Sequence, residues 1–153
     1  MSTAHRSGSV VAAHGRHYVV ASGDELVQCL PRGKKGTLAC GDRVQFAMTG
    51  ADQGVIEAVD PRSSLFYRSA AHRAKLLAAN ATQAAVVVAG EPSFSDELIA
   101  RVLAAAEHQG MRGLIVLNKV DLEAPTASAR ARLAPFRAAG YTVVETHARR
   151  GEA

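Results

Sequence analysis

The sequence lacks a membrane-spanning segment, a signal peptide and a metal-binding cysteine motif. It has no uninterrupted apolar stretch near the roughly twenty residues that a membrane-spanning helix requires. Its N-terminus lacks the apolar core of a signal peptide. The two cysteines, Cys29 and Cys40, have no metal-ligand spacing. We therefore expect a cytoplasmic protein with reduced cysteines, no metal site and no membrane contact.

Charged residues are also few, at 21% of the 153 residues, whereas hydrophobic residues reach 48%. This balance is typical of a folded chain and excludes a disordered one. The length allows one medium domain or two small ones, each with a modest core. We expect the chain to be monomeric.

Short alternating or β-branched runs separated by glycines fill the first part of the chain. The expected strands are residues 10–13, 17–21, 26–31, 43–48 and 55–59. Five such strands predict a small barrel, the oligonucleotide-binding (OB) fold, whose open face and loops commonly bind RNA. Tyr18 and Phe46 are the only aromatic residues of this segment. We therefore expect electrostatic and shape contacts with structured RNA rather than base stacking.

Arginine and lysine cluster in two places, although the net charge is only +4. One cluster lies in a glycine-containing loop, and the other follows the predicted barrel. Their members are Arg32, Lys34 and Lys35, and then Arg62, Arg68, Arg73 and Lys75. Such clusters suit nucleic-acid phosphates, but basic loops that only keep a surface hydrated explain them equally well. We take Arg32, Lys34, Lys35, Arg62 and Arg68 as the candidate RNA contacts.

From Leu76 the pattern changes to alternating strands and helices. The apolar run 84–89 predicts a strand buried on both faces of a parallel sheet. Further strands are expected at 114–117 and 141–145, and a helix over 125–139 that breaks near Pro135. The β-α-β-α-β order predicts a right-handed parallel sheet with about half the strands of a nucleotide-binding domain.

A second helix is expected between the first two of these strands. It begins at the N-cap Ser95 and ends near Gly110. Apolar residues at helical spacing form one face of it. They are Leu98, Ile99, Val102, Leu103 and Ala106. We expect this face to be part of the core rather than a ligand site.

Asn118, Lys119 and Asp121 directly follow the predicted strand 114–117. Ligands of parallel α/β sheets bind there, beyond the carboxyl ends of the strands. The Asp121 carboxylate can accept from both N–H groups on the Watson–Crick edge of guanine, where adenine offers a C–H and an acceptor. Asn118 can serve N7, and the stem of Lys119 can cover one purine face. The alternative is a polar turn, but we favour a guanine-binding site.

A guanine site alone does not hydrolyse GTP, because the phosphates require the glycine-rich loop GxxxxGK[ST]. No segment of the sequence matches it. Around Gly33 and Lys34 the first glycine would fall at Gln28 and the final Ser or Thr at Lys35. Either the chain is not a GTPase, or the usual order is permuted and the loop lies beyond Ala153.

Short motifs spread over nearly the whole chain carry a family resemblance. They are RGKK at 32–35, LACGDRV at 38–44, DQGVI at 52–56, YRS at 67–69, LAAN at 77–80, EPSFS at 91–95 and LNKVDL at 117–122. Together they resemble the ribosome small subunit-dependent GTPase A family, circularly permuted GTPases that act late in assembly of the bacterial small ribosomal subunit. In that family an OB-fold barrel precedes a GTPase domain whose guanine site comes before its phosphate-binding loop.

The resemblance implies a domain organisation. An OB-fold RNA-binding domain is expected over 1–62, a linker over 63–75, and the first half of a circularly permuted, Rossmann-like P-loop GTPase domain over 76–153. A guanine-supporting loop would fall at His147, Ala148 and Arg149, where histidine replaces serine. We expect His147 to be an ordinary solvent-exposed residue near a terminus. The P-loop, the Mg²⁺-binding switches and the Zn²⁺ ligands would lie after Ala153, so we expect a version truncated before them.

The resemblance further implies a GTP-binding and GTP-hydrolysing factor in late maturation of the small ribosomal subunit. Its cofactor would be GTP or GDP, its partners the small subunit and its rRNA, and Mg²⁺ and Zn²⁺ are expected only for a full-length member. Because this chain carries only the guanine part of the site, we expect weak nucleotide binding and no hydrolysis. The alternative is a non-enzymatic module that binds ribosomal RNA without useful nucleotide binding.

Overall fold

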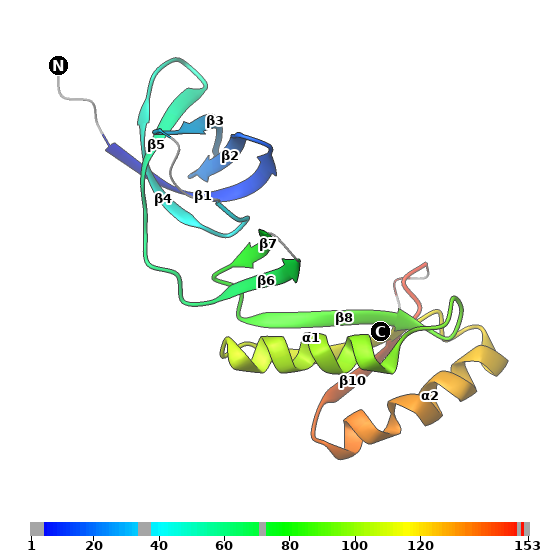
Figure 1. Ribbon diagram of the computed structural model, residues 1–153. Helices are drawn as coiled ribbons and strands as arrows, with labels where there is room; N and C mark the ends of the chain where they lie inside the picture. Colours follow the sequence, from blue (N-terminus) through cyan, green and yellow to red (C-terminus); the bar gives the residue numbers. More distant parts are fainter. Residues whose placement is uncertain (1–4, 34–37, 71–72, 150, 152–153) are drawn as a thin grey trace. The chain divides into compact units, whose positions relative to one another are not determined.

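The computed structural model describes residues 5–33, 38–70, 73–149 and 151, with the backbone alone at 70 and 73. The chain divides into two compact units, Met1–Ala81 and Thr82–Ala153 (Figure 1). No helix within the described ranges is long and apolar enough to cross a membrane.

Five strands of the first unit close into a barrel in the order β1-β2-β3-β5-β4 (Figure 1). They are β1 (His5–His14), β2 (His17–Ser22), β3 (Glu25–Pro31), β4 (Arg43–Met48) and β5 (Gln53–Val59). All pairs are antiparallel except β3 with β5. This barrel confirms the predicted OB fold. Strand β1 begins earlier than expected because its polar first half pairs with β4.

The barrel interior is filled by alternate side chains of these strands. Phe46, Val20 and Val44 are fully buried, and Val10 and Val27 are nearly so. Burying a side chain of this size contributes about 1.5 to 3 kcal/mol. The period-2 alternation that predicted the strands is therefore the pattern that fills the core.

The segment predicted as a linker forms a two-stranded hairpin instead. Strand β6 (Leu65–Ala70) pairs antiparallel with β7 (Arg73–Ala79). Its base is bonded to the barrel, because Ala79 N–H donates to Cys40 O at 2.8 Å and the Asn80 amide donates to Gly41 O at 2.9 Å. A Cβ on Gly41 would collide with Ala79 O. The first unit consequently ends at Ala81, beyond the boundary expected at 75.

The second unit has the predicted β-α-β-α-β order. Its parallel strands β8 (Gln83–Ala89), β9 (Arg112–Asn118) and β10 (Thr142–Thr146) lie in the order β10-β9-β8. The connections are helices α1 (Asp96–His108) and α2 (Glu123–Ala138). The break expected near Pro135 is absent from α2. Ala139 N–H still donates to Pro135 O at 3.0 Å, so the helix continues around the proline.

Helix α1 begins and ends as predicted. The Ser95 side chain accepts from Leu98 N–H at 3.2 Å, and Gly110 follows the helix with a left-handed φ of 69°. Ile99, Leu103 and Ala106 are buried. Leu98, which was expected in the core, is 60% exposed.

Both helices contribute to one core cluster on one face of the sheet. Ile99 and Leu103 of α1 and Leu133 of α2 pack with Ile115 and Leu117 of β9. On the other face Val87 of β8 is 64% exposed. The prediction that β8 is buried on both faces is therefore wrong. The apolar run is an edge strand with one covered face.

Candidate nucleotide-binding site

The loops after β9 and β10 meet at the carboxyl edge of the sheet. Thr146, at the end of β10, pairs with Asn118, at the end of β9. A pocket of about 420 Å³, here called the base pocket, lies between the loops. Its lining residues are Asn118, Lys119, Asp121, Leu122, His147, Ala148 and Arg149. The guanine-binding candidates and the predicted supporting loop are thus brought together in a pocket of ordinary ligand size.

Asn118 is fixed by the third strand. Its side-chain Oδ1 accepts from Thr146 Oγ1 at 3.2 Å and from Ala148 N–H at 3.1 Å. Both bonds use the carbonyl oxygen, so the donor end of the amide remains suited to the N7 acceptor of a purine. The Ala148 N–H itself is directed to Asn118.

Lys119 has a left-handed backbone, with φ of 61°. Such a conformation costs a non-glycine residue roughly 1 to 2 kcal/mol. Its carbonyl accepts from Leu122 N–H at 3.1 Å and from Thr126 Oγ1 at 3.4 Å, which stabilises the turn. The ammonium donates to Glu91 O at 3.1 Å. Lys119 is therefore held at both ends beside the base pocket.

Asp121 has a histidine neighbour. The Nε2 atom of His147 lies 3.3 Å from Asp121 Oδ1. The Asp121 side chain is 41% exposed, whereas that of His147 is only 12% exposed. The expectation that His147 is an ordinary exposed residue is therefore wrong, because its ring lies against the carboxylate of the base pocket.

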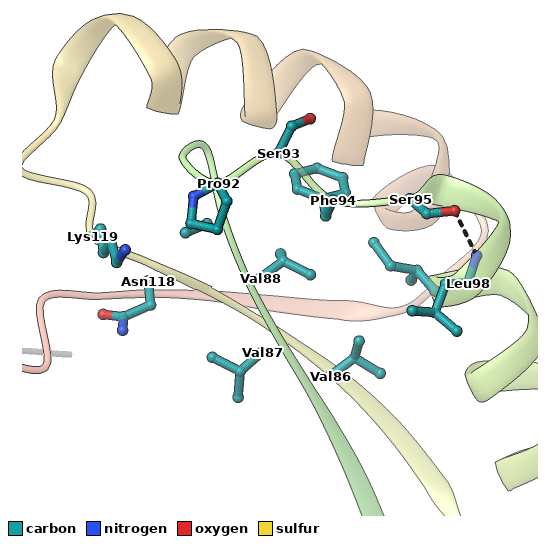
Figure 2. Close-up of a pocket in the computed structure, with 12 residues that line it drawn as sticks. Val86, Val87, Val88, Pro92, Ser93, Phe94, Ser95, Leu98, Asn118 and Lys119 are labelled. Carbon is teal, nitrogen blue, oxygen red and sulfur yellow. Dashed lines mark hydrogen bonds between the residues drawn. The ribbon is translucent and has the colours of Figure 1, made fainter.

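A second pocket of about 460 Å³ lies beside β8, between the 92–95 loop and α1. Figure 2 shows Val86, Val88, Phe94 and Leu98 around this side pocket, with Asn118 and Lys119 at one end. Its lining is largely apolar. Since Asn118 and Lys119 line both pockets, the side pocket adjoins the base pocket at these two residues.

Arg132 of α2 holds the loop that borders the side pocket. Its guanidinium donates to Ser93 Oγ at 2.8 Å and to Phe94 O at 2.6 Å, and it pairs with Asp96 at 3.0 Å. It also lies 4.2 Å over the Phe94 ring. Glu91 directly precedes this loop, and its carbonyl accepts a hydrogen bond from the Lys119 ammonium.

The candidate RNA contacts all belong to the first unit. Arg32 is 72% exposed and pairs with Glu57 at 2.9 Å. Arg68 is exposed on β6 and stands opposite exposed Lys75 of β7. Lys34, Lys35 and the side chain of Arg73 lie outside the described residues.

Arg62 has a structural partner. Its Nε and Nη2 donate to Asp42 Oδ1 and Oδ2 at 2.7 and 2.8 Å, and the Asp42 side chain is fully buried. The hydrogen bonds to Asp42 raise the pKa of Arg62 above its usual value. Asp42 also accepts from Ala39 N–H at 2.8 Å. An RNA contact by Arg62 remains a prediction.

Within the described ranges no group of three or more His, Cys, Asp or Glu residues could hold a metal ion. The Mg²⁺ and Zn²⁺ expected for full-length family members remain predictions.

Residues 59–153 match the sequence model of the RsgA GTPase family. The chain belongs to that family. It is 52% identical over 140 residues to the small ribosomal subunit biogenesis GTPase RsgA of Burkholderia pseudomallei (strain K96243), covering 90% of this chain and 45% of that protein. It is 50% identical over 150 residues to RsgA of Paraburkholderia xenovorans (strain LB400), covering 97% and 48%. The chain thus spans about half the length of these relatives.

Two solved structures share the fold of this chain. YjeQ from Thermotoga maritima superposes with a TM-score of 0.72 at 27% identity, over 97% of this chain and 54% of its own. YloQ, a circularly permuted GTPase, gives 0.65 at 24% identity, over 94% and 52%. The family resemblance and the fold class predicted from the motifs are confirmed.

Several site residues escaped the sequence analysis. Thr146 and Thr126 support Asn118 and Lys119, and Arg132 holds the neighbouring loop. A hydroxyl at the end of the third strand could have been noticed, because strand ends of a parallel sheet meet at one edge. Arg132 carries no such signal, since nothing in a helical pattern shows which loop a side chain reaches.

Proposed function

We propose that the chain carries the guanine-recognition part of a GTPase that takes part in maturation of the small ribosomal subunit. The supporting observation is the base pocket, where Asn118, Lys119 and Asp121 meet with Asn118 fixed by Thr146 and Ala148. A carboxylate that accepts two N–H groups selects guanine, because adenine has only one donor on that edge and places an acceptor opposite the carboxylate. The names of the RsgA relatives supply the process.

Nucleotide binding by this chain should be weak. Phosphate contacts supply much of the affinity of such sites, and the 153 residues contain no GxxxxGK[ST] loop. Hydrolysis also requires groups that position the phosphates and the attacking water. GDP should therefore bind through its base, and the chain alone should not cleave GTP.

The test is a titration of ¹⁵N-labelled chain with GDP or ADP, followed by NMR. GDP should change the chemical shifts of backbone amides in the base pocket, and ADP should change them far less. Asp121→Ala should weaken GDP binding about tenfold, because two donors of the base lose their partner. Asp24→Ala, in the turn before β3, is the matched control. Equal shifts with GDP and ADP, or phosphate release from GTP above a protein-free control, would contradict the proposal.

We also propose that the first unit binds ribosomal RNA. The supporting observation is the pair Arg68 and Lys75, two exposed cations directly opposite each other across the hairpin. Like charges in this position are destabilising unless an anion lies between them. A phosphate group of an RNA backbone would relieve the repulsion. If RNA binds and GDP does not, the chain is the non-enzymatic RNA-binding module.

Co-sedimentation with small ribosomal subunits over a salt series tests this surface. Arg68→Ala/Lys75→Ala should lower affinity and flatten the salt slope by about two units, one for each lost phosphate contact. Arg101→Ala/Arg112→Ala, two exposed cations of the second unit, is the control. The triple replacement of Arg32, Lys34 and Lys35 by Ala tests the other cluster in the same assay. Unchanged binding in both would remove these residues from the RNA interface.

A further inference from the structure

The contact between His147 and Asp121 involves an atom that the proposed guanine site also needs. Guanine recognition requires both oxygens of the Asp121 carboxylate, one for each N–H of the base. His147 Nε2 lies 3.3 Å from one of them, Oδ1. Within the described ranges this imidazole is the one charged or hydrogen-bonding side chain placed against that carboxylate.

Histidine is the side chain that gains or loses a proton near neutral pH. The other charged residues lining the base pocket are Lys119 and Asp121, from the loop after β9, and Arg149, two residues beyond His147. Asp121 is the single anion in this set. An imidazolium at His147 would therefore be drawn to the Asp121 carboxylate, whose Oδ1 lies 3.3 Å from Nε2.

We propose that His147 makes guanine binding depend on protonation, by forming an ion pair with Asp121 that competes with the base. This inference rests on the proposed guanine site. The neutral imidazole leaves the carboxylate available to the two N–H groups of guanine. The imidazolium neutralises the carboxylate and holds Oδ1, so the hydrogen bonds to the base lose their charge assistance. Guanine binding and protonation of His147 then oppose each other, and each weakens the other by the same factor.

The test compares GDP binding by the wild-type chain, His147→Gln and His147→Lys at pH 5.5 and pH 8. Glutamine keeps a hydrogen-bonding side chain that never carries charge, and lysine keeps a permanent cation. GDP titrates over the same range, so each affinity is divided by that of His147→Gln at the same pH, which removes the change in the nucleotide. The relative affinity of the wild type should fall about tenfold from pH 8 to pH 5.5, corresponding to one pK unit of coupling. His147→Lys should bind GDP weakly at both pH 5.5 and pH 8.

A second readout follows the imidazole directly. The chemical shifts of the His147 ring are followed by NMR as the pH changes. In wild-type protein saturated with GDP, the ring should deprotonate at a lower pH than in the free protein. His108→Gln, which removes an exposed histidine in the last turn of α1, should behave as the wild type.

The outcomes separate the two proposals. GDP binding that is selective and sensitive to Asp121→Ala, but equal in wild type and His147→Gln at both pH values, overturns the role of His147 and leaves the guanine site intact. Tighter binding by the wild type at pH 5.5 than by His147→Gln would also overturn it, since the imidazolium would then support the base. No GDP binding by any variant at either pH overturns both.

Discussion

The Asp42 carboxylate is the most deeply buried charge among the described residues. It has no exposed surface and receives three hydrogen bonds, two from Arg62 and one from Ala39. Removing such an anion from water is costly unless it is paired in this way. Asp42 and Arg62 therefore stabilise the segment that leaves the barrel, next to the base of the β6–β7 hairpin.

Arg62→Ala should lower the free energy of unfolding of the chain by about 3 kcal/mol, because it leaves Asp42 buried and unpaired. Arg68→Ala should change it by less than about 0.5 kcal/mol, since Arg68 is exposed. Urea denaturation of both variants checks this. The comparison is also a control for the RNA assay, because partial unfolding of Arg62→Ala could otherwise be mistaken for the loss of an RNA contact. Equal stability of the two variants would show that Arg62 does not compensate the buried anion.

The 92–95 loop shows how one side chain can order an element. Arg132 donates to Ser93 and Phe94 and pairs with Asp96, while Glu91 of the same segment accepts from Lys119. The bonds connect α2 to the loop, and the loop to the base pocket. In the proposed guanine site Arg132 would act through Lys119 and not by touching the nucleotide, so we propose it as a positioning residue.

Arg132→Ala should increase the hydrogen exchange of residues 93–96 and weaken GDP binding a fewfold, with a stability loss of about 1 to 2 kcal/mol from the lost hydrogen bonds. Arg101→Ala removes an exposed cation that pairs with Glu97 along α1, and should change neither measurement. If GDP affinity is unchanged while the loop exchanges faster, the loop does not position Lys119.

The elements were largely predictable where one physical signal dominated. The barrel strands followed from alternation, and α1 followed from its Ser95 cap and the glycine that ends it. The position of Asn118 and Asp121 at the carboxyl edge of the sheet followed from their place directly after a predicted strand. The hairpin was missed because β7 is rich in charge and alanine, and because the bonds that hold its base to Cys40 and Gly41 are tertiary contacts. The approach of His147 to Asp121 is likewise a tertiary contact that no local pattern encodes.

At the scale of the whole molecule the two units differ in how their sheets end. The barrel is closed, so its strands have no free edge. The described sheet of the second unit has two edge strands, β8 and β10, and its helices share one core cluster on one face. Free edges and a one-sided core leave more backbone hydrogen bonds accessible to solvent.

The second unit should therefore open more readily than the barrel. Native-state hydrogen exchange should be faster for amides of β8, β9 and β10 than for those of β2, β3 and β4. Increasing urea should bring the second unit to its transition first. Equal protection of the two sheets, or a single transition for both, would show that the open edges do not limit stability.

Both cysteines of the chain lie in the barrel unit, and they differ in access to solvent. Cys40 is half-buried, whereas Cys29 is 1% exposed, and burial raises the pKa of the Cys29 thiol. Only the thiolate attacks alkylating or disulfide reagents, so Cys29 is protected both by exclusion of the reagent and by its retained proton. Its modification rate should rise with pH and with every opening of the barrel. Thiol modification can therefore follow opening of the barrel unit, whereas the second unit of this sequence contains no cysteine that could report its own opening.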